Sequence, residues 1–349
     1  MTYGKALIEG PYIIAEVGLT HEGSLGNALK FIDIFSELGA SAIKFQMHIP
    51  EHESSADDSF REATLFPQDS SRIEYYSRTS FDLNEWKVLR KHCRQKKIDF
   101  GMSIFSEEAL YKTVKLNPDF LKVGSGESLD IFFINKVLST KYPVIISTGL
   151  NTEQERAVII DIAAQNRGRV SVLHCSSLYP VTPEYWRLND LQLNIKKNPG
   201  INFGISDHSG KLSPSIIAAN YGARIFEVHV TISNMSFGPD VSSSHDPISF
   251  ALLVSEIKQV FQSKLSPDTK YSEKVRKIRS LFSKSLYYKD NLKAGKILNE
   301  KDLCYLKPGV YIPSTLREKY IGRTLRVNVC SHTPLKITDF ADENINIHS

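Results

Sequence analysis

The sequence predicts a (β/α)₈ barrel followed by a small β-rich domain. Short apolar runs alternate with stretches of helical spacing eight times over about 260 residues, which is the repeat number and the length of such a barrel. After residue 264 the alternation stops, and the chain becomes polar before it changes to short strands and turns. An open doubly wound sheet is the alternative, but no G-x-G-x-x-G motif follows the first strand.

The predicted strands and helices follow directly from these two patterns. Strands are expected at 12–18, 41–46, 98–105, 119–125, 143–149, 169–175, 201–206 and 224–230. Helices are expected at 24–39, 83–97, 106–116, 128–139, 151–165, 211–221 and 247–263. A polar, irregular insertion occupies about 47–80. We therefore expect a barrel domain at 1–264, a linker at 265–284 and a small domain at 285–349.

Composition indicates an ordinary globular protein of the cytoplasm. The chain has 349 residues, 41% of them hydrophobic, and a net charge of +4. Its densest basic run, 90–97, has no interleaved aromatic residues, so we expect a solvated helix face and no nucleic-acid site. The four cysteines form no C-x-x-C pair and are expected to be reduced thiols. We see no signal peptide and no apolar run long enough to span a membrane.

Two histidines at the ends of neighbouring predicted strands suggest a metal site. In "IFEVHVT", Glu227 and His229 are two residues apart, so both point to one side of the strand. His208 likewise follows Ser206 by two residues. Neutral imidazoles on adjacent strands could bind a divalent metal, with Asp240 as a possible further ligand. The alternative is a pair of core histidines that bond to backbone carbonyls.

Two lysines in apolar strands suggest an anion site. Lys44 and Lys122 are expected to be buried, and a buried ammonium needs an anionic partner. Internal carboxylates could serve, Glu16 and Glu127 among them. The alternative is a phosphate or carboxylate ligand, for which nearby hydroxyls and glycine N–H groups would be suited. The hydroxyls in question belong to Ser103, Ser125, Ser147 and Thr148.

Several motifs together resemble the sialic acid synthase family, which makes N-acetylneuraminic, legionaminic and pseudaminic acids. They occur in the order "IIAEVGLTHEG", "ASAIKFQ", "KVGSGE", "VIISTGL", "HCSSLYPVTPE", "GISDHSG", "FEVHVT" and "FGPD". The segment that begins "SLYYKDNLKAGKILNEKDLCYLKPG" resembles the antifreeze-like (SAF) domain of that family.

The resemblance implies an enzyme that condenses phosphoenolpyruvate with an open-chain N-acetylated aminohexose, forms a nine-carbon 2-keto acid and releases phosphate. It implies a domain-swapped homodimer and a divalent metal held by His208 and His229, typically Mn²⁺, with Mg²⁺ or Co²⁺ possible. Catalytic roles would fall to Glu16, Lys44 and Glu227. Phosphoenolpyruvate would lie near Lys44, Ser103, Lys122, Ser125, Ser147, Ser177 and Ser206. Sugar contacts would involve Glu16, Tyr179, Glu227, Asp240 and Lys307, and Gln46 would also bind substrate.

Departures from the family motifs bear on the acceptor sugar. Thr20 replaces a usual Asn, Ser103 a Thr, Val228 a Lys and Lys307 an Arg, and segment 232–240 lacks an Arg. The acceptor could be N-acetylmannosamine or a 2,4-diacetamido-6-deoxyhexose. Two other hypotheses stay open: a metal-dependent aldolase or isomerase on the same barrel, and an inactive barrel that serves as a binding protein.

Overall fold

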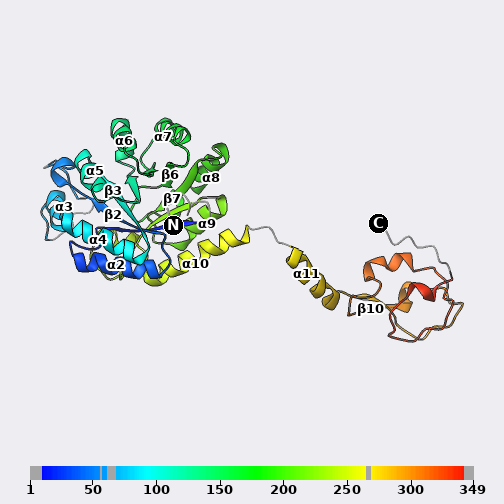
Figure 1. Cartoon of the computed structure of the whole chain (residues 1–349). Coiled ribbons are helices and arrows are strands. Elements are labelled where there is room, and N and C mark those ends of the chain that lie inside the picture. The colour runs from blue at the N-terminus through cyan, green and yellow to red at the C-terminus, as the bar shows by residue number, and fades with distance from the viewer. Residues whose placement is uncertain (1–9, 56, 61–67, 265–268, 342–349) are drawn as a thin grey trace. The chain divides into compact units, whose positions relative to one another are not determined.

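The computed structural model describes residues 10–55, 57–60, 68–264 and 269–341. Its contacts divide the chain into two compact units, Met1–Lys264 and Leu265–Ser349 (Figure 1). The extreme N-terminus, in which no signal peptide was seen, lies outside the described residues up to residue 9.

The first unit is a closed barrel of eight parallel strands in sequence order, so the predicted fold is confirmed. The strands are β1 (Tyr12–Gly18), β2 (Ala42–Met47), β3 (Asp99–Ile104), β4 (Phe120–Val123), β5 (Val144–Ser147), β6 (Val170–Cys175), β7 (Asn202–Asp207) and β8 (Ile225–His229). β1 pairs with both β2 and β8, which closes the barrel. In a barrel of this kind the loops after the strands form the functional face.

A helix follows each strand and covers the outside of the barrel (Figure 1). These helices are α2 (Leu25–Glu37), α4 (Leu83–Lys96), α5 (Glu107–Val114), α6 (Ile131–Leu138), α7 (Glu153–Gln165), α8 (Leu188–Lys197), α9 (Leu212–Tyr221) and α10 (Pro247–Ser263). Helix α8 was not predicted from the sequence, and it begins after Arg187 without a side-chain cap. Helix α3 (Arg72–Thr79), inside the insertion, was also missed, although Ser71 caps it by accepting from the N–H of Glu74.

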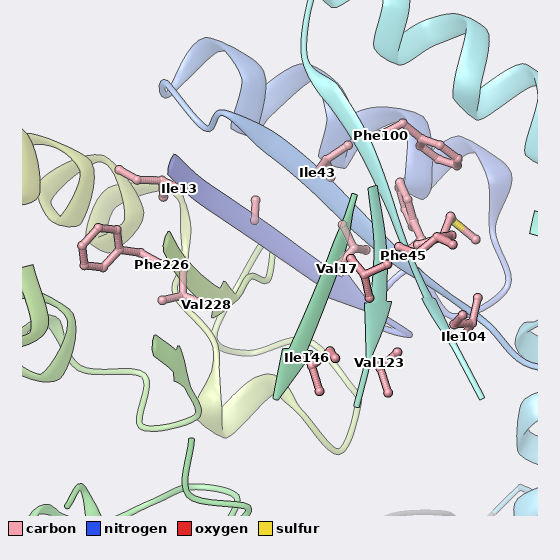
Figure 2. Close-up of a cluster of buried hydrophobic side chains, with 14 of the residues drawn as sticks. Ile13, Val17, Ile43, Phe45, Phe100, Ile104, Val123, Ile146, Phe226 and Val228 are labelled. Carbon is pink, nitrogen blue, oxygen red and sulfur yellow. The ribbon is translucent and has the colours of Figure 1, made fainter. Parts of the chain in front are cut away.

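Side-chain alternation along the strands separates two apolar layers. Ile13, Ala15 and Val17 of β1 face the surrounding helices, in the large cluster that Figure 2 shows in part. Tyr12 and Ile14 face the barrel interior. Their interior cluster also contains Ala42, Phe120, Ile145, Leu173 and Ile225. These residues fill the barrel interior on the N-terminal side of Glu16. The next inward-facing residues, toward the C-terminal ends of the strands, therefore meet on top of an apolar layer.

The second unit combines one helix with a small β-rich fold. Helix α11 (Thr269–Phe282) lies within the segment expected as a linker, whose residues 265–268 are outside the described part. β9 (Ser285–Tyr288) and β10 (Leu303–Leu306) pair antiparallel. The core of this unit includes Leu286, Tyr288 and Phe340. Its likeness to an antifreeze-like domain stays a prediction. No helix within the described ranges of either unit is long and apolar enough to cross a membrane.

Candidate active site

Three charged side chains meet inside the barrel because register and alternation bring them together. Glu16 of β1 is paired in register with Lys44 of β2 on one side and with His229 of β8 on the other. Glu227 of β8 is paired with Ser206 of β7. Glu16, Lys44 and Glu227 are each at most 5% exposed. Burial of such charges is costly unless they compensate one another.

The two lysines and two carboxylates of the interior do compensate one another. Lys44 Nζ lies 2.6 Å from Glu16 Oε2 and 3.6 Å from Glu227 Oε2, and it donates to Ser103 Oγ at 2.6 Å. Lys122 Nζ is 3.9 Å from Glu227 Oε1. The internal-partner alternative for Lys44 is therefore realised through Glu16. Lys122 is held less closely, and its ammonium donates to its neighbour's carbonyl, Val123 O, at 3.0 Å.

These charges shift pKa values in opposing directions. Burial alone would raise the pKa of Glu227, but Lys122, Lys44 and the hydrogen bond from Ser206 Oγ at 2.7 Å outweigh it, and the pKa of Glu227 falls to about 2. Burial lowers the pKa of Lys122, and Glu227 opposes that shift. The Glu227 carboxylate is thus ionised at neutral pH and acts as a fixed counter-charge to the lysines.

An inner cavity of about 90 Å³ opens above this charge cluster. Its polar lining includes Ser103, Lys122, Ser125 and Ser147, which were expected to bind an anion. The Ser147 hydroxyl is buried, and its described polar neighbour is the Cys175 thiol, a weak hydrogen-bonding group. A buried hydroxyl without a strong partner is uncommon in native proteins and suggests a missing ligand or water. The remaining lining residues are Glu16, Lys44, Gln46, Phe105, Gly124, Cys175, Tyr179, Ser206, His208, Glu227 and His229.

A glycine controls the packing beside the inner cavity. A Cβ on Gly149 would come within 2.4 Å of both Cys175 Sγ and Ser177 Oγ. Ser177 Oγ in turn lies 2.8 Å from Ser125 Oγ. Only glycine allows the loop after β5 to approach the end of β6 this closely. The paired hydroxyls of Ser125 and Ser177 are thereby held at the edge of the cavity.

An outer cavity of about 200 Å³ shares lining residues with the inner one. Gln46, Phe105, Tyr179 and His229 border both cavities. The insertion after β2 provides one wall of the outer cavity, and the loop after β8 provides Asp240 at another. The insertion's lining residues are His48, Phe60, Arg72, Tyr75 and Tyr76. None of these was predicted from the sequence, because the insertion was interpreted as an irregular loop.

His208 and His229 lie side by side, as the strand order predicted. Their ring centroids are 5.4 Å apart. His208 Nδ1 lies 3.1 Å from the carbonyl oxygen of Ser176, so it donates there and leaves the Nε2 lone pair free to accept from Tyr179 Oη at 3.1 Å. Burial and the neighbouring His229 lower the pKa of His208 to about 3, so this ring is neutral. The alternative of histidines held by backbone carbonyls is therefore realised at His208 Nδ1.

The donor set is chemically suited to a divalent metal. His229 Nδ1 is buried and makes no hydrogen bond to a described residue, and Asp240 Oδ2 lies 3.8 Å from it. Two imidazoles with a nearby carboxylate are common metal ligands. Among the residues the structure describes, no group of three or more His, Cys, Asp or Glu side chains is already placed as a complete ligand set. The fit therefore rests on the orphaned His229 nitrogen and on the Nε2 lone pair of His208, which a metal would take in place of the Tyr179 hydroxyl.

Lys307 lies in the second unit, and its expected contact with substrate stays a prediction. Its ammonium is 4.9 Å from the centroid of the Phe282 ring, at the end of α11. That distance is within the range of a cation–π contact. Apart from Lys307, the expected site residues lie in the barrel unit, on strands or in the loops that follow them.

Comparison with known proteins gives consistent matches over most of the chain. The NeuB family matches residues 31–268. The N,N'-diacetyllegionaminic acid synthase of Campylobacter jejuni is 27% identical, over 90% of this chain and 96% of that protein. The pseudaminic acid synthase of Helicobacter pylori is 28% identical, over 95% and 98%. A crystal structure of N-acetylneuraminic acid synthetase from Leptospira borgpetersenii, in complex with citrate, is similar with a TM-score of 0.67 and 27% identity, over 78% and 93%.

Proposed function

Because this chain belongs to the NeuB family, we propose that it condenses phosphoenolpyruvate with an open-chain N-acetylated aminohexose to give a nine-carbon 2-keto acid and inorganic phosphate. The relatives named above make legionaminic, pseudaminic and N-acetylneuraminic acids, which supports this reaction class. The observation that carries the proposal is the pairing of two cavities. An inner cavity lined by two lysines adjoins an aromatic outer one, and Gln46, Phe105, Tyr179 and His229 border both.

The inner cavity is proposed to bind phosphoenolpyruvate. Its phosphate and carboxylate need cations and hydrogen-bond donors in a buried site. Lys44 and Lys122 supply the cations, and Ser147 supplies a hydroxyl whose described polar neighbour is the weakly hydrogen-bonding Cys175 thiol. Ser103, Ser125, Ser177 and Ser206 add hydroxyls nearby. We propose that donor binding draws the lysines away from their carboxylates, which lie 2.6 to 3.9 Å away before it binds.

The proposed reaction balances as an addition followed by loss of phosphate. C3 of phosphoenolpyruvate forms a bond to the aldehyde carbon of the acceptor, and the aldehyde oxygen takes a proton to become a hydroxyl. Water adds to C2 and loses its protons, and the C2–O bond to phosphate breaks to leave the 2-keto group. Glu16 and Glu227 face the space in which these protons move. Glu227, with its pKa lowered to about 2, stays ionised and is suited to orient a substrate hydroxyl or water by accepting a hydrogen bond.

His208 and His229 are proposed to hold a divalent metal, with Mn²⁺ as the first choice and Asp240 close by. When bound, such a metal supplies Lewis acidity to the aldehyde oxygen of the acceptor. The role of His208 in this arrangement depends on its neutral ring, which Ser176 orients through the Nδ1 hydrogen bond. Tyr179 stacks on His208 at a centroid distance of 4.1 Å and forms part of the wall between the two cavities.

The outer cavity is proposed to bind the acceptor sugar. Aromatic faces suit the apolar side of a sugar ring, and Asp240 and Gln46 suit its hydroxyls. Arg72 is the arginine of its lining, and Asp58 already neutralises it at 3.0 and 3.2 Å. This charge balance favours an acceptor without a phosphate group. N-acetylmannosamine and a 2,4-diacetamido-6-deoxyhexose both meet that condition, and Lys307 is a further proposed contact to the N-acyl group.

We further propose that the enzyme works as a cytoplasmic, domain-swapped homodimer. The second unit exposes an apolar stripe on α11, where Ile278 is 55% and Phe282 is 65% exposed. Val275 and Leu281 lie in the same helix and are 42% and 57% exposed. Such a stripe gains stability by burial against another surface. Light scattering coupled to size exclusion would give twice the mass of one chain, and a monomer at micromolar concentration would reject the dimer.

The decisive test is metal-dependent release of phosphate from phosphoenolpyruvate in the presence of acceptor. We expect release only when the divalent metal, phosphoenolpyruvate and one of the two acceptors are all present, with a nine-carbon 2-keto acid found by mass spectrometry. No release with either acceptor would reject the synthase. Carbon–carbon bond formation from pyruvate would favour the aldolase alternative. Neither activity, with retained metal and donor binding, would favour the binding-protein alternative.

A further inference from the structure

We propose that His48 and Glu53 form a positioning pair that locks the side-chain amide of Gln46 and, through it, holds Glu16 in place for the reaction. The proposal rests on the proposed function, because Gln46 and Glu16 matter here as residues that face the substrates. Neither His48 nor Glu53 was predicted from the sequence as a site residue.

A turn directly after β2 brings the chain back toward the end of that strand. Lys44, Gln46 and His48 alternate along and just beyond the strand, so they point to the same side. A 3₁₀ turn, η1 (Pro50–His52), begins with the proline and reverses the chain. Glu53 at its end returns to His48, and its Oε2 lies 2.7 Å from His48 Nδ1.

Glu53 is anchored by both of its oxygens. Oε1 accepts the backbone N–H of Ile49, while Oε2 contacts the His48 ring. The side chains of Glu53 and His48 are 6% and 4% exposed. Buried and bonded at both oxygens, the carboxylate of Glu53 has one orientation available to it.

Two aromatic rings fix the plane of the His48 imidazole. Tyr76 of α3 stacks on it at 3.9 Å between centroids and 12° between planes. Phe105, just after β3, stacks at 4.2 Å and 10°. Both rings also line the outer cavity. The imidazole is thus held between them with its Nε2 3.0 Å from Gln46 Oε1.

The hydrogen-bond chain is consistent in only one direction. Glu16 Oε2 lies 2.6 Å from the Lys44 ammonium, and Glu16 Oε1 lies 2.8 Å from Gln46 Nε2. A carboxylate paired with an ammonium accepts, so the Gln46 amide donates to Glu16 through its NH₂. Gln46 Oε1 must then accept from His48 Nε2–H. A reversed amide would set its oxygen against the Glu16 carboxylate and its NH₂ against the His48 N–H.

Glu53 supports this arrangement from the other side of the ring. Its Oε2 faces Nδ1 at 2.7 Å, so Nδ1 also donates, and the buried carboxylate compensates a ring that donates at both nitrogens. His48 and Glu53 therefore act on Gln46 by fixing the position of the His48 Nε2–H group that donates to it. During turnover the donor substrate is proposed to draw Lys44 away from Glu16. Gln46 is then the remaining hydrogen-bond partner of Glu16 among the described residues, so a fixed amide keeps that carboxylate aligned.

A matched set of variants tests this assignment. His48→Phe keeps a ring in the stack and removes both ring nitrogens. We expect kcat to fall by about 10- to 100-fold, with KM for phosphoenolpyruvate changed less than about threefold. Glu53→Gln is the conservative control. Its amide accepts from Ile49 N–H and donates to His48 Nδ1, so Nε2–H is kept and kcat should stay within about threefold of wild type.

A double-mutant cycle asks whether His48 acts through Gln46. We expect His48→Phe to cost nothing further in a Gln46→Leu background. The proposal would be overturned if the losses of kcat in His48→Phe and Gln46→Leu multiplied in the double variant. It would also be overturned by a wild-type kcat in His48→Phe, or by equal losses of kcat in His48→Phe and Glu53→Gln. If the His48→Phe substitution strands the buried carboxylate of Glu53 and the variant fails to fold, the double variant His48→Phe/Glu53→Gln removes that charge, and it carries the same expectation for kcat and for the cycle.

A readout that needs no turnover separates this proposal from the proposed function. In the isotope-labelled protein loaded with diamagnetic Mg²⁺ and without substrate, the Gln46 side-chain NH₂ resonances should be distinct and protected from exchange. They should persist in Glu53→Gln and lose protection in His48→Phe. Unchanged resonances in His48→Phe would overturn the positioning role. Failure of the wild-type protein to release phosphate would overturn only the proposed function.

Discussion

Replacing Lys122 with methionine would test the assignment of the inner cavity to the donor. Methionine matches the length of the lysine stem and removes only the charge. In the resting site Lys122 Nζ lies 3.9 Å from the Glu227 carboxylate, whereas Lys44 lies 2.6 Å from Glu16. Lys122 is therefore the lysine less committed to an internal partner. Its loss leaves Glu227 with Lys44 at 3.6 Å and with the Ser206 hydroxyl, so the fold should persist.

The size of the effect follows from burial and distance. Lys122 is 3% exposed, so its attraction for an anion at about 4 Å is worth about 4 kcal/mol at an effective dielectric constant near 20. Glu227 opposes part of this attraction from a similar distance. We take about 2.7 kcal/mol as the net loss, which corresponds to about a 100-fold rise in KM for phosphoenolpyruvate. The acceptor KM should change much less, because Lys122 lines only the inner cavity.

The assay is phosphate release with each substrate varied in turn, supported by calorimetric binding of phosphoenolpyruvate. Lys87→Met is the matched control, because Lys87 is an exposed lysine on α4 and should give wild-type constants. A KM for phosphoenolpyruvate within twofold of wild type in Lys122→Met would refute the assignment. So would a rise in acceptor KM alone, which would place Lys122 at the sugar.

Three further perturbations address the metal, the orphaned hydroxyl and the charge cluster. His229→Ala should abolish turnover and weaken Mn²⁺ binding at least tenfold with an unchanged melting temperature, and retained activity would reject its metal role. Ser147→Ala should leave the free energy of unfolding within about 0.5 kcal/mol, since the hydroxyl interacts only weakly with the Cys175 thiol, yet raise KM for phosphoenolpyruvate; a wild-type KM would contradict this. Glu227 has a pKa lowered to about 2 in the folded state from 4.5, so its stabilising contribution is present above pH 4.5 and is lost as pH falls from there towards 2. Urea unfolding should show a steeper loss over that range in wild type than in Glu227→Gln, and parallel curves would argue against the shift.

Strand periodicity was enough to predict the barrel and much of its charged interior. Once Glu16, Lys44 and Glu227 were assigned to strands, alternation placed them on one side, and the order of strands in a closed barrel made them neighbours. His208 and His229 followed from the same reasoning. Lys44 and Glu227 lie on strands that are separated by β1. Their side chains come close because the barrel interior is narrow and because apolar side chains fill the part of it beneath them.

The insertion after β2 could not be interpreted in this way. His48 lies just beyond a strand, and Glu53 reaches it only because a proline-initiated turn reverses the chain between them. Tyr76 comes from a helix whose polar composition gave little periodic signal, although Ser71 and Glu74 could have marked its start. The stack of Tyr76, His48 and Phe105 joins the insertion to the loop after β3. Such contacts depend on loop geometry, which no period in the sequence encodes.

The balance of formal charges in the inner cavity limits how a donor can bind there. Lys44 and Lys122 face Glu16 and Glu227, so the cluster has no net charge before substrate arrives. Net charge therefore does not attract a trianion to this site, and binding requires that ion pairs separate. Lys122 can leave its longer contact to Glu227 at lower cost than Lys44 can leave Glu16 and Ser103, both at 2.6 Å. Separation of Lys44 also frees one oxygen of Glu16, and among the described residues only the amide of Gln46 then holds that carboxylate. Opening of the Lys122 pair thus governs donor binding, so Lys122→Met should raise KM for phosphoenolpyruvate. Opening of the Lys44 pair makes Glu16 depend on Gln46, so His48→Phe should lower kcat.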